Sequence, residues 1–243
     1  MKRLFTGLTD PGLVRSANQD SYFIDPEGRF FIVADGMGGH AGGQEASRIA
    51  TEVIKTYLND AWTSDEESSM LLKESILKAN HAILQDQLSH PERSDMGTTI
   101  VVAMFRNEEP WCAHIGDSRL YRLRGAKLEQ ITEDHTWVAR AMKAGDLTAA
   151  QARVHPWRHI LSKCLGREDL KHVDVKMFDY QGSDRLLLCS DGLTEELSDH
   201  LIASYLKGIR ACEKAADSLV NAAKEKGGRD NITVVIVTND PSG

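Results

Sequence analysis

Eight short runs rich in β-branched and aromatic residues are spread along the chain, and they restrict its fold more than any other feature. Turn-forming residues such as Gly, Pro, Asp and Asn separate them. These runs predict strands at residues 21–25, 30–34, 98–105, 111–115, 119–124, 172–178, 185–190 and 231–238. A further run at 127–131 follows the turn RGAK and predicts a hairpin with 119–124.

Helical periodicity occurs in paired blocks instead of following each strand. Apolar residues recur at helical spacing in 44–58 and 67–89, and two more helices are expected near 196–206 and 211–226. This order differs from the βαβα alternation of a parallel sheet, so we predict the α+β class. The Ala- and His-rich segment 135–170 lies between strand regions, and we expect it to form a helical lid or inserted subdomain.

Charge and hydropathy argue against nucleic-acid binding and membrane insertion. The 243 residues include 36 acidic and 29 basic side chains, with a net charge of -7 and no dense Lys/Arg cluster. Neither a membrane span nor the apolar core of a signal peptide is recognisable. The four cysteines lack the spacing of a disulfide framework or metal site. We expect a soluble cytoplasmic protein with reduced cysteines, whose final residues TNDPSG are frayed.

Four aspartates stand at the ends of predicted strands, close to glycine. They are Asp35 in VADGMGG, Asp117 in HIGDSR, Asp191 in CSDG and Asp230 in GGRDN. Converging carboxylates supply the oxygen ligands that a hard cation requires, and glycine lets backbone carbonyls and water come close. Because no Cys cluster or His pair offers softer ligands, Mg²⁺ or Mn²⁺ is favoured over Zn²⁺.

The glycine-rich stretch at 36–41 also allows a nucleotide-binding loop or an ordinary turn. GMGGHA formally fits the GxGxxA fingerprint of dinucleotide binding, after a strand and before a helix. Against this, Asp35 would repel the pyrophosphate, and the helix at 44–58 leads into no second strand. The lack of a GK[ST] sequence excludes a Walker loop. An ordinary Asp-Gly turn explains one such motif better than four strand ends.

Six motifs, in order along nearly the whole chain, resemble those of the PPM/PP2C family of metal-dependent protein Ser/Thr phosphatases. The chain is especially similar to minimal bacterial members, and most similar to cyanobacterial phosphatases that act on the phosphorylated signalling protein PII. The resemblance implies one phosphatase domain over 1–243 that acts as a monomer on phosphoproteins. The motifs are NQD (18–20), VADGMGGHAGG (33–43), MGTT (96–99), HIGDSR (114–119), CSDGLTEEL (189–197) and GGRDNITVVIV (227–237).

The same resemblance implies a central sandwich of two antiparallel β-sheets flanked by helices, with metal ions at one edge. Asp35 corresponds to the carboxylate that bridges two ions, and the Gly36 carbonyl to a ligand of the second ion. Asp191 and Asp230 correspond to ligands of the first ion. Asp117, together with Asp191, corresponds to a weaker third site. The implied cofactors are therefore two Mn²⁺ or Mg²⁺ ions with a third, weaker one.

Two further residues have implied roles in the reaction. Arg15, in DPGLVRSANQD, corresponds to an arginine that grips the substrate phosphate. Asp20 corresponds to an acid that hydrogen-bonds a metal-bound water. The implied chemistry is in-line attack of a metal-bridging hydroxide on phosphorus, without a phosphoenzyme. Each residue also fits a simpler role, Arg15 as a surface charge and Asp20 and Asp117 as turn residues.

One position departs from the pattern of eukaryotic members, in which a His directly follows the Asp-Gly pair. Here that position is Met37, which cannot donate a proton. The acid that protonates the leaving alcohol is therefore left open among His40, His159 and metal-bound water. Both histidines also fit ordinary surface or core positions.

The segment 135–170 corresponds to the flap of bacterial members. Its sequence HPWRH at 155–159 either contacts the phosphoprotein or packs on its own helices. A rival function from another class is an inactive module that binds phosphoproteins without cleaving them. The presence of Asp35, Asp191 and Asp230 favours the enzyme.

Overall fold

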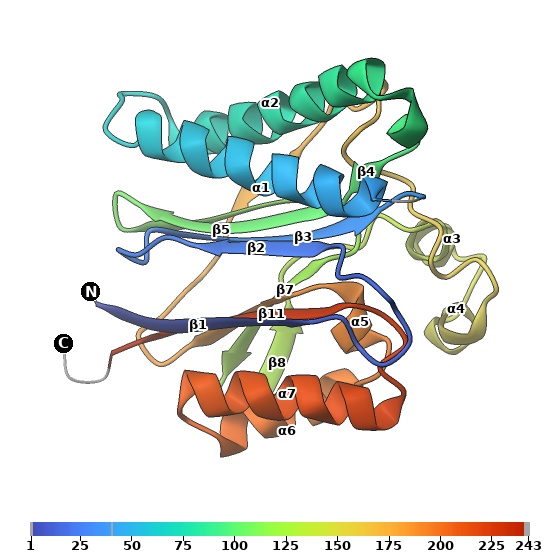
Figure 1. The fold of residues 1–243 in the computed structure, drawn as a ribbon. Coiled ribbons are helices and arrows are strands. Elements are labelled where there is room, and N and C mark those ends of the chain that lie inside the picture. Colours follow the sequence, from blue (N-terminus) through green and yellow to red (C-terminus); the bar gives the residue numbers. More distant parts are fainter. Residues whose placement is uncertain (1, 40, 241–243) are drawn as a thin grey trace.

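Two antiparallel sheets stack face to face at the centre of the molecule (Figure 1). The computed structural model describes residues 2–39 and 41–240. One sheet has the strand order β1 (Arg3–Asp10), β11 (Ile232–Asn239), β10 (Arg185–Cys189), β7 (Arg119–Arg124) and β8 (Lys127–Gln130). The other has the order β2 (Asp20–Ile24), β3 (Phe30–Met37), β5 (Ile100–Arg106), β6 (Glu109–Ile115) and β9 (Asp174–Met177), with β4 (Gly97–Thr98) paired to the end of β3. The predicted α+β sandwich is confirmed.

Strand β3 is apolar throughout because it is covered on both faces. Phe31 and Val33 pack between the two sheets, whereas Phe30 and Ile32 pack beneath the helices on the outer face. A strand covered on both sides carries a continuous apolar run instead of an alternating one. Burial on both faces holds the strand firmly, and its end carries Asp35.

Paired helices cover the outer face of each sheet (Figure 1). Helices α1 (Gly42–Asp60) and α2 (Ser68–Ser89) cover the sheet that contains β3, and the 3₁₀ helix η1 (Pro91–Arg93) follows them. Helices α6 (Asp199–Gly208) and α7 (Cys212–Lys226) cover the other sheet, and the short α5 (Asp191–Thr194) follows β10. The four long predicted helices are confirmed, as is the β7–β8 hairpin. None of the helices in residues 2–39 and 41–240 combines the length and apolarity needed to cross a membrane.

Both chain ends differ from the sequence-based expectation. Strand β1 was not predicted, because Gly7 interrupts a run that has little β-branched character. It nevertheless pairs with β11 along its whole length, from Arg3 opposite Asn239 to Asp10 opposite Ile232. The prediction of a frayed tail is wrong for residues 238 and 239, which belong to β11, and residues 241–243 lie outside the described part of the chain.

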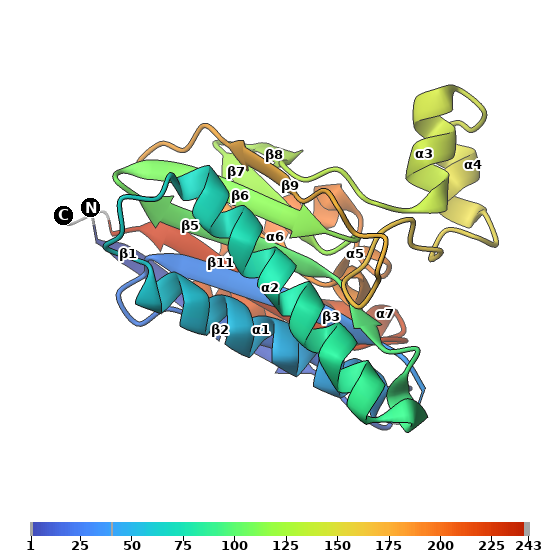
Figure 2. The same ribbon diagram turned by 90° about the horizontal axis from the view of Figure 1, so that it is seen from above.

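The predicted insert projects from one end of the sandwich (Figure 2). It contains α3 (Trp137–Ala144) and α4 (Ala149–Val154), each begun by a threonine whose hydroxyl accepts a backbone N–H. Residues 155–170 contain no helix, so the helical prediction holds only for the first half. We call residues 135–170 the flap.

Within the flap, the outer segment 137–160 has its two ends, which we call the roots, side by side. The Trp137 N–H donates to the Ile160 carbonyl at 2.8 Å, and Thr136 bridges to Leu161 as an antiparallel pair. The aromatic rings of His155 and Trp157 pack on Trp137, with centroids 4.9 and 5.0 Å from the Trp137 ring. His155 and Trp157 of the HPWRH sequence therefore pack on the flap's own helix, as one of the two interpretations expected.

Candidate active site

The carboxylates predicted as metal ligands lie close enough to affect one another's pKa. Asp191 begins α5, which lies at one end of the sandwich (Figure 1). Asp35 lies near the end of β3, and Asp191 directly follows β10 after Ser190. Asp230 lies in the loop before β11, and Asp117 lies in the turn between β6 and β7. Strand ends that are remote in the sequence thus bring four carboxylates together.

The negative charges of these carboxylates repel one another and raise their pKa values. Burial raises the pKa of Asp35 well above its ordinary value, and the charges of Asp20, Asp191, Asp117 and Asp230 raise it further. Burial and the charge of Asp191 likewise raise the pKa of Asp117. Burial and the charge of Asp230 raise the pKa of Asp191 to about 6. A divalent cation among these oxygens would offset the repulsion, and hard oxygen donors are the ligands that Mg²⁺ and Mn²⁺ prefer.

Asp20 lies opposite Asp35 in the β2–β3 pair and is buried. Its Oδ2 accepts hydrogen bonds from the hydroxyls of Ser190 at 2.7 Å and Thr233 at 2.6 Å. Its Oδ1 is buried and has no hydrogen-bond partner among the described residues. Burial raises the pKa of Asp20 to about 7. A buried acceptor without a donor fits a site that is completed by a hydrated cation.

The glycines after Asp35 and Asp191 have a packing role. A Cβ atom on Gly36 would lie 1.9 Å from the Gly43 carbonyl oxygen, at the start of α1. A Cβ on Gly192 would lie 2.0 Å from the Asn231 carbonyl oxygen. Each Asp-Gly pair therefore lets the end of a strand press directly against another backbone segment.

Thr99 of the MGTT motif connects two of the carboxylate-bearing segments. Its hydroxyl accepts a hydrogen bond from the Asp35 N–H at 3.0 Å and lies 2.7 Å from the Ser118 hydroxyl. Ser118 is buried. This contact gives Ser118 a structural role beside Asp117.

Arg15 lies at the mouth of the site, in the loop between β1 and β2. Its Nη2 donates to Asp230 Oδ2 at 2.6 Å, and slightly more than half of the side chain is exposed. The Asp230 carboxylate holds the pKa of Arg15 above its ordinary value through this hydrogen bond. The loop thus presents a guanidinium next to the carboxylates.

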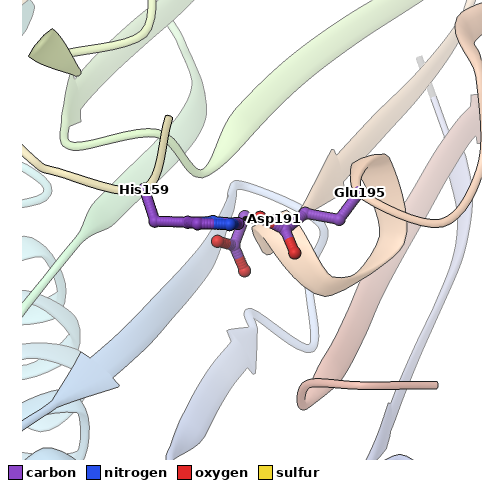
Figure 3. Close-up of side chains that lie close together, drawn as sticks. All are labelled: His159, Asp191 and Glu195. Atoms are coloured by element: carbon purple, nitrogen blue, oxygen red, sulfur yellow. Dashed lines mark ion pairs between the residues drawn. The ribbon is translucent and has the colours of Figure 1, made fainter. Parts of the chain in front are cut away.

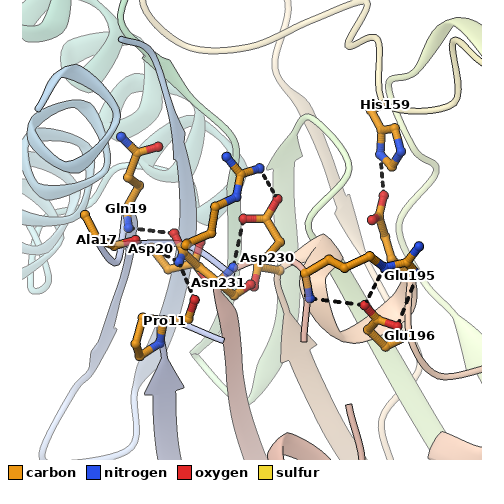
Figure 4. Close-up of polar contacts among 12 residues, drawn as sticks. Pro11, Ala17, Gln19, Asp20, His159, Glu195, Glu196, Asp230 and Asn231 are labelled. Carbon is orange, nitrogen blue, oxygen red and sulfur yellow. Dashed lines mark hydrogen bonds and ion pairs between the residues drawn. The ribbon is translucent and has the colours of Figure 1, made fainter. Parts of the chain in front are cut away.

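Asn231 anchors the same loop, and the sequence did not point to it (Figure 4). Its Oδ1 accepts the Gln19 N–H at 2.7 Å, and its Nδ2 donates to the carbonyls of Pro11 at 3.1 Å and Ala17 at 2.9 Å. Asn231 is buried and immediately follows Asp230. One side chain therefore fixes the Arg15 loop relative to a carboxylate of the cluster. In the sequence, the only indication of this role was that Asn231 directly follows Asp230.

The flap reaches the cluster through His159 (Figure 3). Its Nδ1 contacts Glu195 Oε1, and the ligand atoms of His159, Asp191 and Glu195 all lie within 4.8 Å of one another. Burial and the charge of Asp191 raise the pKa of Glu195 to about 7, whereas burial lowers the pKa of His159. The two pKa shifts bring the proton affinities of the carboxyl and the imidazole closer together, so one proton can be shared across this contact. Glu195, within the CSDGLTEEL motif, was not singled out from the sequence.

The structure therefore brings together most of the predicted site residues, while His40 lies outside the described residues. Those that meet are Arg15, Asp20, Asp35, Gly36, Asp117, His159, Asp191 and Asp230.

A family model described as protein phosphatase 2C matches residues 14–226, which is most of the chain. The chain belongs to the protein phosphatase 2C family. Serine/threonine phosphatase stp of Listeria monocytogenes serotype 4b (strain F2365) is 37% identical to this protein phosphatase 2C over 241 residues. That alignment covers 96% of this chain and 94% of the relative.

Solved structures agree with this assignment. The serine/threonine phosphatase PstP/Ppp of Mycobacterium tuberculosis matches with a TM-score of 0.90 and 33% identity, over 99% of this chain and 100% of that one. The catalytic domain of PstP in complex with two manganese ions matches with a TM-score of 0.86 and 34% identity, over 98% and 99%. The predicted family and its serine/threonine phosphatase class are confirmed. The dinucleotide alternative is excluded, because β3 pairs antiparallel with both β2 and β5.

Proposed function

We propose that this protein phosphatase 2C hydrolyses phosphoserine and phosphothreonine in phosphoproteins, with two divalent cations held by Asp35, the Gly36 carbonyl, Asp191 and Asp230. The observation that carries this proposal is the cluster of mutually repelling carboxylates beside the unpartnered Asp20 Oδ1. When bound, the cations would activate a water for in-line attack and neutralise charge on the phosphoryl oxygens. Asp20 Oδ1 would orient that water by accepting its hydrogen.

Arg15 is proposed to bind the phosphoryl group of the substrate. Its Nη2 donates to Asp230, and its other N–H groups make no hydrogen bond to the described residues, so the guanidinium can donate to a phosphoryl oxygen next to Asp230. Because the side chain is half-exposed at the mouth of the site, a phosphorylated side chain can reach it from solvent.

The leaving serine or threonine alkoxide needs a proton, and Met37 cannot supply one. His159 is proposed as a candidate, because its Nδ1 shares a hydrogen bond with Glu195, whose pKa is raised to about 7. A proton held between these two groups lies close to Asp191. His40 and a bound water remain the other candidates.

The choice of metal and the third ion also belong to the proposal. The catalytic domain of PstP has been solved with two manganese ions, which supports Mn²⁺ for the core pair, with Mg²⁺ as the alternative. Asp117 and Asp191 would hold a weaker third ion. The two carboxylates lie close together, because burial and then the charge of Asp191 raise the pKa of Asp117.

The cellular setting is proposed on fewer observations. Cys112, Cys164, Cys189 and Cys212 are all free thiols, as is typical of a reducing compartment such as the cytoplasm. We propose a monomer in which residues 1–243 form one phosphatase domain with the flap at 135–170. A PII-like signalling protein is the proposed substrate within the phosphoprotein class.

The test is hydrolysis of a phosphoserine peptide and of an aryl phosphate, with and without Mn²⁺ or Mg²⁺. We expect turnover of both only with the cation, and calorimetry should detect at least two bound ions. Phospho-PII and unrelated phosphoproteins would then be compared as substrates, and size-exclusion chromatography would report the oligomeric state. A chain that binds the phosphopeptide but cleaves neither substrate with Mn²⁺ present would be the inactive binding module.

A further inference from the structure

A cavity of about 600 Å³ lies between the flap and the segment that joins α5 to α6. Asp117 and Asp191 line its inner end, and Arg153 and Arg158 line its flap wall. The cavity therefore runs from the proposed metal site outward along the flap. Its volume is that of an ordinary ligand-binding cleft.

The remaining carboxylates that line this cavity are already satisfied. Each has a hydrogen-bonding partner within the protein: Asp134 with Arg119 at 2.6 Å, Glu196 with Arg229 at 2.8 Å, Asp199 with the Tyr121 hydroxyl at 3.1 Å, and Glu195 with His159. Bound cations would in turn balance Asp117 and Asp191.

Arg153 and Arg158 are different. Throughout residues 2–39 and 41–240, neither side chain makes a hydrogen bond or an ion pair. Arg153 is exposed at the end of α4, and Arg158 is half-buried in the irregular part of the flap. The charge of Arg158 partly offsets the rise in the pKa of Glu195, which burial causes, whereas Arg153 lines the cavity as a guanidinium with no hydrogen bond or ion pair to the described residues.

The flap also supplies an apolar surface beside these arginines. Val138 and Ala152 are buried, whereas Met142 is 38% exposed. An extended peptide could place an apolar side chain here while a neighbouring acidic side chain meets a guanidinium.

We propose that this cavity binds the substrate segment adjacent to the phosphorylated residue and selects an acidic side chain there through Arg153 and Arg158. The proposal rests on the proposed phosphatase function of the same site. The occupant is an extended segment of a phosphoprotein with Asp or Glu close to the phosphoserine or phosphothreonine. Charge complementarity identifies it, because both guanidinium groups line the flap wall of the cavity and make no hydrogen bond or ion pair to the described residues.

The experiment uses the full chain with Mn²⁺ and phosphoserine peptides that carry Glu, Ala or Lys at one flanking position at a time. We expect kcat/KM to be about fivefold higher for Glu than for Lys at one or more positions, the size of one partly exposed ion pair. Arg153→Glu should abolish or reverse this preference and leave aryl phosphate hydrolysis unchanged. Arg158 is a less clean probe because it adjoins His159.

The matched control is Arg140→Glu. Arg140 is an exposed arginine of the same flap whose side chain lines a different cavity, next to His135 and Lys143. This variant should keep the preference of the parent. Equal Glu and Lys rates in a parent that hydrolyses aryl phosphate, or an unchanged preference in Arg153→Glu, would overturn the proposal while the phosphatase function stands.

If neither peptide nor aryl phosphate were hydrolysed, the proposed function would fail separately. Fluorescence anisotropy of the same labelled phosphopeptides would then decide the matter of the cavity. Tighter binding of the Glu peptide, lost in Arg153→Glu, would support it, and equal binding of all three peptides would refute it.

Discussion

The two walls of the active site are built differently. On the sandwich side, Asp20 and Asn231 are buried, and each is held by two or more hydrogen bonds to other segments. On the flap side, Val154 is 79% exposed and Trp157 51% exposed, and residues 155–160 contain no helix or strand. The buried wall can hold the fixed distances that catalysis requires, and the exposed wall suits the proposed contact with the substrate segment.

The largest expected effect tests the sandwich wall. Asp191→Asn removes a charge from the proposed cation site and should lower kcat/KM by at least about 100-fold, toward both peptide and aryl phosphate. Steady-state kinetics over a range of Mn²⁺ concentrations would measure it. Asp199→Asn is the control, since Asp199 lines the same cavity but, among the described residues, its carboxylate accepts only from the Tyr121 hydroxyl. An Asp191→Asn enzyme as active as the parent would refute the assigned metal site.

Asn231→Ala should have the next largest effect. Loss of three hydrogen bonds frees the Arg15 loop, so we expect kcat/KM to fall about 10- to 100-fold and unfolding free energy to fall by about 1–3 kcal/mol. In the double variant Asn231→Ala/Arg15→Ala, the loss of kcat/KM should be clearly less than the sum of the two single losses in free-energy terms. Both substitutions weaken the same proposed contact between Arg15 and the phosphoryl group.

Asn80→Ala is a matched control for that variant. Asn80 also makes three bonds to a loop: its Oδ1 accepts the N–H groups of Gly166 and Arg167, and its Nδ2 donates to the Arg167 carbonyl. It lies in α2, so its loss should destabilise the protein similarly with little change in kcat/KM. Equal losses of activity in the two variants would mean that Asn231 has only a structural role.

A smaller effect tests the flap wall. If His159 helps to protonate the leaving alcohol, His159→Gln should lower kcat by about tenfold or more on a phosphoserine peptide. An aryl phosphate, whose leaving group needs no proton, should be hardly affected. His155→Gln is the control, because His155 packs on Trp137 and has no contact with Glu195. Equal losses on both substrates would point away from proton transfer by His159.

The smallest expected effect concerns stability without cations. The pKa of Asp20 is raised to about 7 and that of Asp191 to about 6, so these two carboxyls bind more protons in the folded state than in the unfolded state above about pH 4. Metal-free protein should therefore lose stability as the pH rises from about 4 to about 7, with a fall of a few degrees in Tm. Thermal unfolding with and without Mn²⁺ would measure this, and the cation should remove most of the slope. An identical slope under both conditions would contradict the proposed cation site.

The sequence predicted the sandwich wall better than the flap wall, for a physical reason. Asp35 and Asp191 follow apolar runs, and such runs can be recognised locally, so their positions at strand ends could be inferred. The ordered motifs supplied the rest of the carboxylate set and the fold.

What could not be predicted depends on contacts between remote segments. Asn231 acts on a loop more than 200 positions earlier, and Glu195 meets His159 only because the flap folds back. Strand β1 was missed because its pairing with β11 compensates for a weak local pattern. Residues 155–170 of the flap form no helix, and their sequence has no helical or strand periodicity from which a structure could be predicted.

The adjacent roots of the flap have a consequence for building chimeric phosphatases. Thr136 and Leu161 pair with each other, so the segment between them starts and ends at one point and can be exchanged as a cassette without stretching its host. The Arg15 loop cannot be transplanted alone, because its anchor, Asn231, is encoded near the opposite end of the gene. Recombination between family members should therefore exchange the flap readily, while the Arg15 loop is inherited together with the last strand.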